Sequence, residues 1–172
     1  AVIPHAGYVY SGGVAGEVFS QLDIPHTVVI LNPNHTGAGQ PFAVWPEGVW
    51  STPLGDVPVD APLATELISA CPPLVSETRA HLGEHSGEVM LPFLQVKRPD
   101  VSIVVIVVDM APLETLQQLG WALATVLSRM QPRPLIIASS DMTHFQPEET
   151  ARGQDKLAID AMLKLDEEEL YS

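Results

Sequence analysis

Three uninterrupted apolar runs, rich in β-branched residues, constrain the fold more than any other feature of this chain. They cover residues 27–31, 101–108 and 134–138. Their apolar residues do not alternate with polar ones, which is typical of strands that are buried on both faces. A sheet with both faces covered is usually parallel, with helices packed on either side.

Stretches of helical character separate these runs. They span residues 13–21, 61–70, 87–97, 112–130 and 147–165. The alternation predicts an α/β fold with a mostly parallel central sheet flanked by helices. Residues 41–45 and 48–50 are separated by turn-forming residues, so we expect a short hairpin there, at the edge of the sheet.

The length of 172 residues suits one domain with a sizeable hydrophobic core and is too short for two domains that each have such a core. We therefore expect a single domain over residues 1–172. The sequence starts within an apparent strand and ends in a charged helical stretch. We accordingly expect natural segments to be missing at both ends.

The charge balance restricts the partners. The chain has 21 acidic and 8 basic side chains, a formal net charge of -13, and no cluster of lysine or arginine. Nucleic acid and anionic membranes attract cations, so we expect neither as a partner. No apolar run approaches the roughly 20 residues that a membrane helix needs. Because Cys71 is the only cysteine, we expect a cytoplasmic protein without disulfides.

Two histidines follow directly on predicted strands. Residues 2–4 lead into His5, and the run at 27–31 leads through the turn-like residues 32–34 into His35. Ligands of open α/β sheets bind beyond the carboxyl ends of the strands, where the loops converge. A lone histidine is more often structural, but two at equivalent strand ends favour a shared divalent metal ion.

A third predicted strand, at residues 134–138, runs into the sequence Ser139-Ser140-Asp141-Met142-Thr143-His144. It therefore brings a carboxylate, a hydroxyl and an imidazole to the same edge of the sheet. Asp141 and His144 are accordingly candidate metal ligands alongside the two histidines at the other strand ends.

Another polar group precedes the helical stretch at 87–97 and contains Glu84, His85 and Ser86. Ser86 has the side chain of a helix N-cap, which would hold His85 just outside the first turn. The positive end of a helix favours a neutral imidazole, and a neutral imidazole can act as a general base. On these facts His85 is equally compatible with a catalytic base and with an exposed histidine beside a cap.

Five motifs stand out along the chain. They are Pro4-His5-Ala6-Gly7-Tyr8, Asn32-Pro33-Asn34-His35, Thr52-Pro53-Leu54-Gly55-Asp56, Glu84-His85-Ser86 with Leu91-Pro92-Phe93, and Ser139-Ser140-Asp141-Met142-Thr143-His144. In this order they resemble the Memo family, including the bacterial and archaeal members called AmmeMemoRadiSam system protein B, over essentially the whole chain. The resemblance implies the LigB-like fold of the class III extradiol dioxygenases, which hold non-haem Fe(II) with two histidines and a carboxylate.

By this resemblance His5 and His35 match the two metal histidines of the family, and His85 matches a histidine that lines the same cleft. Animal members carry a cysteine at the position of Thr143. A hydroxyl is a far poorer ligand than a thiolate, so either the metal is bound more weakly here or the third ligand is Asp141, His144 or His85. Nitrogen and oxygen donors favour Fe(II), with Zn(II) or copper as alternatives.

We therefore expect a metal-dependent, dioxygenase-like oxidoreductase that acts on a small molecule or a peptide, with His85 as the residue that moves a proton. One alternative is a zinc-dependent hydrolase in which a metal-bound water attacks and His85 is the base. Another is a metal- or peptide-binding module without turnover. The family name also implies a radical SAM protein as a pathway partner.

Overall fold

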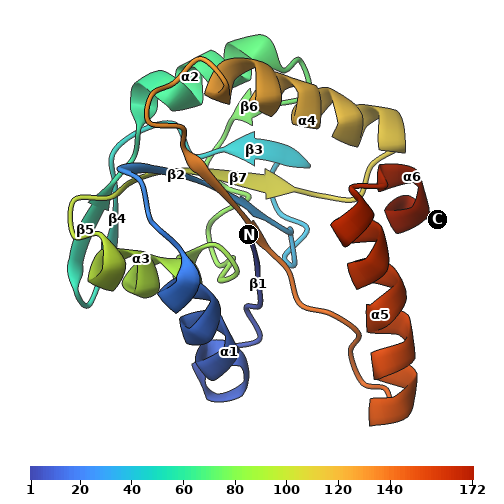
Figure 1. The fold of residues 1–172 in the computed structure, drawn as a ribbon. Coiled ribbons are helices and arrows are strands. Elements are labelled where there is room, and N and C mark those ends of the chain that lie inside the picture. The colour runs from blue at the N-terminus through green and yellow to red at the C-terminus, as the bar shows by residue number, and fades with distance from the viewer. The chain divides into compact units, whose positions relative to one another are not determined.

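The computed structural model describes all 172 residues of the chain, in two compact units, Ala1–Ser140 and Asp141–Ser172 (Figure 1). The strands, all in the first unit, are β1 (Val2–Ile3), β2 (Thr27–Asn32), β3 (Phe42–Val44), β4 (Val49–Thr52), β5 (Gly55–Pro58), β6 (Val75–Ser76), β7 (Ser102–Val108) and β8 (Leu135–Ser139). The first unit has the helices α1 (Tyr8–Gln21), α2 (Ala61–Ala70), η1 (Glu88–Met90), α3 (Leu91–Lys97) and α4 (Leu113–Leu127). The second unit has α5 (Glu148–Lys164) and α6 (Glu167–Tyr171).

Six strands form one sheet in the order β1-β8-β2-β7-β3-β6. β1, β8, β2 and β7 are parallel to one another, whereas β3 runs antiparallel to β7 and parallel to β6. The predicted α/β class with a mostly parallel sheet is therefore confirmed. The parallel strands end at one edge, which is the edge where the sequence predicts the functional residues.

Helices cover both faces of this sheet (Figure 1). α2 and α4 lie on one face, and α1 and α3 lie on the other. Strand β7 shows why its residues do not alternate with polar ones. Val104 and Ile106 pack in the core under α2 and α4, whereas Ile103 and Val105 pack in the core under α1 and α3. Each fully buried residue of this size contributes roughly 1.5–3 kcal/mol.

The predicted edge hairpin between residues 41–45 and 48–50 is wrong. β3 lies inside the sheet beside β7, and β6 forms the edge beyond it. The residues of β3 are buried on both sides, which an edge hairpin would not allow. β4 pairs instead with β5 as a separate antiparallel ribbon. Gly55, at a φ of 117°, supplies the left-handed backbone in the turn that joins them.

The helix predicted at residues 61–70 is found with those bounds as α2. The Asp60 side chain caps it by accepting a hydrogen bond from the Leu63 N–H at 3.1 Å, and Pro62 occupies the first turn. Both are local signals, which explains why the start of this helix can be located from the sequence.

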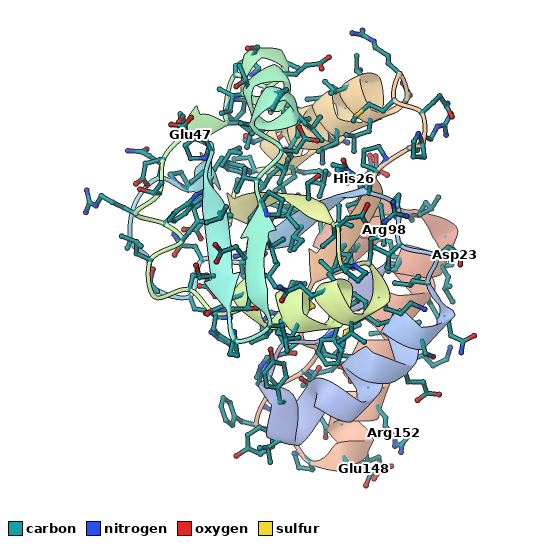
Figure 2. The ribbon with its side chains drawn as sticks, turned by 90° about the vertical axis from the view of Figure 1, so that its left-hand side faces the viewer. Asp23, His26, Glu47, Arg98, Glu148 and Arg152 are labelled. Atoms are coloured by element: carbon teal, nitrogen blue, oxygen red, sulfur yellow. The ribbon has the colours of Figure 1, made fainter.

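The second unit consists of α5 and α6 after an irregular start. α5 carries exposed ion pairs between residues four apart, such as Glu148 with Arg152 at 2.8 Å (Figure 2) and Lys156 with Asp160 at 2.7 Å. Such pairs stabilise a helix only slightly. None of the helices in either unit combines the length and the apolar character that a bilayer crossing requires.

Candidate metal centre

The ends of two parallel strands position the first two histidines. His5 follows β1, which pairs with β8, and His35 follows β2, which pairs with β8 on its other side. The two loops therefore leave the sheet at the same edge. The imidazole centroids of His5 and His35 lie 5.2 Å apart, with the rings nearly perpendicular at 75°.

A third imidazole, from the loop before η1, completes a cluster with them. The His85 centroid lies 5.3 Å from that of His35 and 5.7 Å from that of His5. His5 is only 3% exposed, whereas the side chains of His35 and His85 are 48% and 51% exposed. The structure thus brings together three histidines that are far apart in the sequence, with one side of the cluster open to solvent.

A chain of hydrogen bonds fixes the tautomer of His5. The Ser139 hydroxyl donates to the Ser86 carbonyl oxygen at 2.6 Å. Its oxygen lies 2.8 Å from His5 Nδ1 and, having already used its proton, must accept the hydrogen of Nδ1. His5 therefore carries its ring proton on Nδ1 and its lone pair on Nε2. A neutral imidazole with a lone pair on Nε2 is a metal ligand.

Glu84 fixes His35 in the same way. One carboxylate oxygen, Oε2, accepts the His35 backbone N–H at 2.7 Å, and the other, Oε1, lies 2.9 Å from His35 Nδ1. The Ser86 N–H and hydroxyl also donate to Oε1, at 3.0 and 2.6 Å. Burial alone raises the pKa of Glu84, but hydrogen bonds from Ser86 and His35 outweigh it and lower the pKa to about 2. The ionised Glu84 accepts the proton of Nδ1, so the lone pair of His35 is on Nε2.

Glu84 stands close enough to His35 and His85 to share an ion with them, because their ligand atoms lie within 4.8 Å of one another. Four hydrogen bonds, however, already occupy most of the acceptor positions of its two oxygens. A carboxylate on the far nitrogen of a metal-binding histidine orients the ring and raises its basicity. Glu84 is therefore a positioning residue for His35, and sequence reasoning missed it. Its motif beside His85 was visible, but its partner is 49 residues away.

The predicted N-cap role of Ser86 is wrong. Ser86 is fully buried, its hydroxyl donates to Glu84, and Asn32 Nδ2 donates to the same hydroxyl at 3.2 Å. η1 starts after Gly87 without a side-chain cap. A Cβ on Gly87 would lie 3.0 Å from Asn32 Oδ1 and 3.1 Å from Val105 Cγ1. A side chain at this position would crowd Asn32 at the end of β2 and Val105 in the middle of β7, so glycine favours this close approach of the loop to the sheet.

Asp141 and His144 lie in the second unit, with Asp141 Oδ2 3.7 Å from His144 Nε2. Thr143 is held in the same unit, because its N–H donates to Asp155 Oδ1 at 2.9 Å. This hydrogen bond lowers the pKa of Asp155. The roles of Asp141 and His144 as metal ligands stay predictions.

Two of the three imidazole pairs have the spacing expected around one divalent ion. At a metal–nitrogen distance of about 2.1 Å an ion lies about 3.2 Å from each ring centroid. Ligating rings about 90–110° apart at the ion then have centroids about 4.5–5.3 Å apart. The separations of His35 from His5 and from His85, 5.2 and 5.3 Å, fall in this range, whereas that of His5 from His85, 5.7 Å, lies above it. Imidazole nitrogen suits Fe(II), Zn(II) and Cu(II).

Comparison with known proteins identifies the family of this chain. The family model described as Memo-like protein matches residues 1–172. A MEMO1 family protein of Aquifex aeolicus is 44% identical over 171 residues, which is 99% of this chain and 63% of that protein. One from Desulfurococcus amylolyticus is 41% identical over 175 residues, again 99% of this chain and 62% of that protein. The chain thus spans about three fifths of the length of these relatives. It belongs to the Memo family.

Proposed function

We propose that this chain binds a divalent metal ion through Nε2 of His5 and His35, with Fe(II) favoured over Zn(II) or copper. We also propose that the bound metal serves a dioxygenase-like oxidoreductase reaction. One observation carries the proposal. Ser139 and Glu84 hold Nδ1 of the two rings, which lie 5.2 Å apart, and so leave both with a lone pair on Nε2. Metal-binding histidines characteristically have such a partner on the other nitrogen.

Asp141 or His144 is proposed to complete the ligand set, giving two histidines and one further donor. A set of this size leaves coordination positions open, and the bound ion supplies the Lewis acidity and redox chemistry that side chains lack. In the proposal the protein's own contribution is to fix the two imidazoles and to exclude water from His5, the buried member of the cluster.

His85 is proposed to move a proton. Its Nδ1 lies 3.7 Å from Glu84 Oε1, beyond hydrogen-bond distance, and half of its side chain is exposed. His85 is therefore held less firmly than His35, and a substrate can reach it. A general base must meet its proton directly or through one water, which this exposure permits.

Metal reconstitution tests the ligands. The chain is loaded anaerobically with Fe(II), Zn(II) or Cu(I), desalted, and its metal content is measured. We expect about one Fe(II) per chain, lost in His5→Ala and in His35→Ala. His26→Ala is the control, because His26 is at the amino end of β2, opposite the centre (Figure 2), and should keep the metal. Unchanged metal content in both cluster variants would contradict the proposal.

The remaining roles are separated by measuring metal content and O₂ uptake with catechols together. We expect His85→Ala to retain metal and to lose O₂ uptake, and one of Asp141→Ala and His144→Ala to lose metal. Loss of metal in His85→Ala would make His85 a ligand instead. If the loaded wild-type chain consumes no O₂ with any catechol, the oxidoreductase proposal is rejected in favour of a binding module.

A further inference from the structure

A pocket of about 240 Å³ adjoins the candidate metal centre within the first unit. Trp45, Trp50 and His81 form one part of its wall, and Glu84 and Glu88 form another. Glu84 is also the carboxylate that holds His35. A molecule in this pocket would thus be separated from the cluster of imidazoles by one side chain.

Three aromatic rings from separate segments meet at this pocket. Trp45 follows β3, Trp50 lies in β4, and His81 lies in the loop before η1. Each pair of rings is nearly perpendicular, with centroids 5.4 to 5.9 Å apart. The Glu47 carbonyl oxygen, in the turn that leads into the β4–β5 ribbon (Figure 2), accepts a hydrogen bond from Trp45 Nε1 at 2.8 Å and fixes that ring.

The other two rings have buried polar atoms without partners. His81 is 5% exposed, and neither of its ring nitrogens makes a hydrogen bond. The backbone of Ala43 is near the ring but outside hydrogen-bond geometry. Trp50 Nε1 is buried and unpartnered as well. Because these nitrogens are closed to solvent, a molecule in the pocket does not reach them, and Trp50 and His81 contribute to the wall through their other atoms.

The charge of the wall favours a cation. Two carboxylates line the pocket, no lysine or arginine does, and the whole chain carries a formal net charge of -13. Ammonium groups bind over the faces of tryptophan rings, which attract cations through the ring quadrupole. The remaining wall includes the aliphatic side chains of Val49 and Leu82, which suit an alkyl group.

We propose that this pocket binds a small organic ammonium compound. The ammonium group lies against the indoles of Trp45 and Trp50 and pairs with the carboxylate of Glu88. The proposal goes beyond the metal function and does not require it, because none of these contacts involves the ion.

Titration of the metal-free chain with leucinamide tests the proposal at pH 6.5. 4-Methylpentanamide is the control probe, since it keeps the alkyl chain and the carbonyl but lacks the ammonium group. Binding is followed by the indole N–H resonances of the three tryptophans. Trp121, on α4 and 66% exposed, is the internal control. We expect the Trp45 and Trp50 resonances to shift, the Trp121 resonance to stay, and leucinamide to bind at least tenfold tighter than the neutral amide.

Variants place the ammonium group. We expect Glu88→Gln to weaken leucinamide binding severalfold, whereas Glu66→Gln, the same charge change on α2, should not. Trp50→Leu, which removes one indole face, should weaken it too, and His35→Ala should not, which separates this proposal from that of the metal centre. If both amides bound equally well, the pocket would not recognise the ammonium group. If leucinamide did not shift the Trp45 and Trp50 resonances, it would not bind in this pocket.

Discussion

The candidate metal centre and the aromatic pocket each contain a buried histidine, His5 in the first and His81 in the second. The two regions differ in the hydrogen bonds that their histidines make. In the cluster, His5 Nδ1 bonds to Ser139 and His35 Nδ1 bonds to Glu84. In the pocket, both ring nitrogens of His81 are buried without a hydrogen bond. An imidazole held through one nitrogen offers the other to a metal ion. An imidazole held through neither, with both nitrogens closed to solvent, carries the cost of burying unpaired polar atoms.

The electrostatic consequence differs as well. Burial lowers the pKa of His81 to about 4, an effect that the nearby backbone of Ala43 and the carboxylates of Glu77 and Glu84 oppose only in part. The same Glu84 is kept ionised by the hydrogen bonds that it receives at the cluster. One carboxylate thus serves both regions, as an anchor for His35 and as part of the wall of the aromatic pocket.

The largest effect expected from this comparison is on acid stability. His81 has a pKa of about 4 when folded and 6.5 as a free group, so the unfolded chain binds more protons between these values. The free energy of unfolding should therefore fall as the pH is lowered from 6.5 to 4, by at most about 3 kcal/mol from this residue. In His81→Phe, which cannot titrate, the fall should be smaller by that amount, as measured by urea unfolding at both pH values.

The exposed His26 provides the matched control for this measurement. His26→Ala, which removes an imidazole at the surface, is measured beside His81→Phe. If His81→Phe and wild type lose the same stability on acidification, His81 is not held neutral in the fold and the contrast between the two regions disappears.

A smaller effect is expected at the shared carboxylate. Glu84→Gln keeps the size of the side chain but replaces an oxygen acceptor by a donor, which no longer suits the four donors around it. His35 should lose its fixed orientation, and metal affinity should fall about 10- to 100-fold, as measured by chelator competition. Glu66→Gln should leave it unchanged. Wild-type affinity in Glu84→Gln would show that Glu84 does not position His35.

The smallest effect is expected at Ser139. Ser139→Ala removes the hydroxyl between His5 and the Ser86 carbonyl oxygen, so two buried groups each lose a partner. We expect a loss of about 1–3 kcal/mol in the free energy of unfolding, and a weakening of metal binding no greater than in Glu84→Gln. Ser69→Ala, on the exposed surface of α2, should do neither. If Ser139→Ala lowers the free energy of unfolding but leaves the metal affinity unchanged, the Ser139 hydroxyl has a purely structural role.

The sequence predicted those parts of the fold that depend on neighbouring residues. The apolar runs located β2, β7 and β8, and the helical character of residues 61–70 located α2. His5 and His35 could be grouped because parallel strands end at a common edge, whatever their order in the sheet. The partner of β3 could not be predicted, because strand pairing is chosen by contacts across the whole chain.

By itself, then, the sequence determined the α/β class, the sheet edge at which the candidate metal centre lies, and the histidines that reach it. Only the tertiary structure decided what holds those histidines. Glu84 meets His35 across 49 residues and Ser139 meets His5 across 134, and the aromatic pocket joins three separate segments. Propensity and periodicity act over a few residues, whereas hydrogen bonds of this kind form only where packing of the sheet brings distant side chains together.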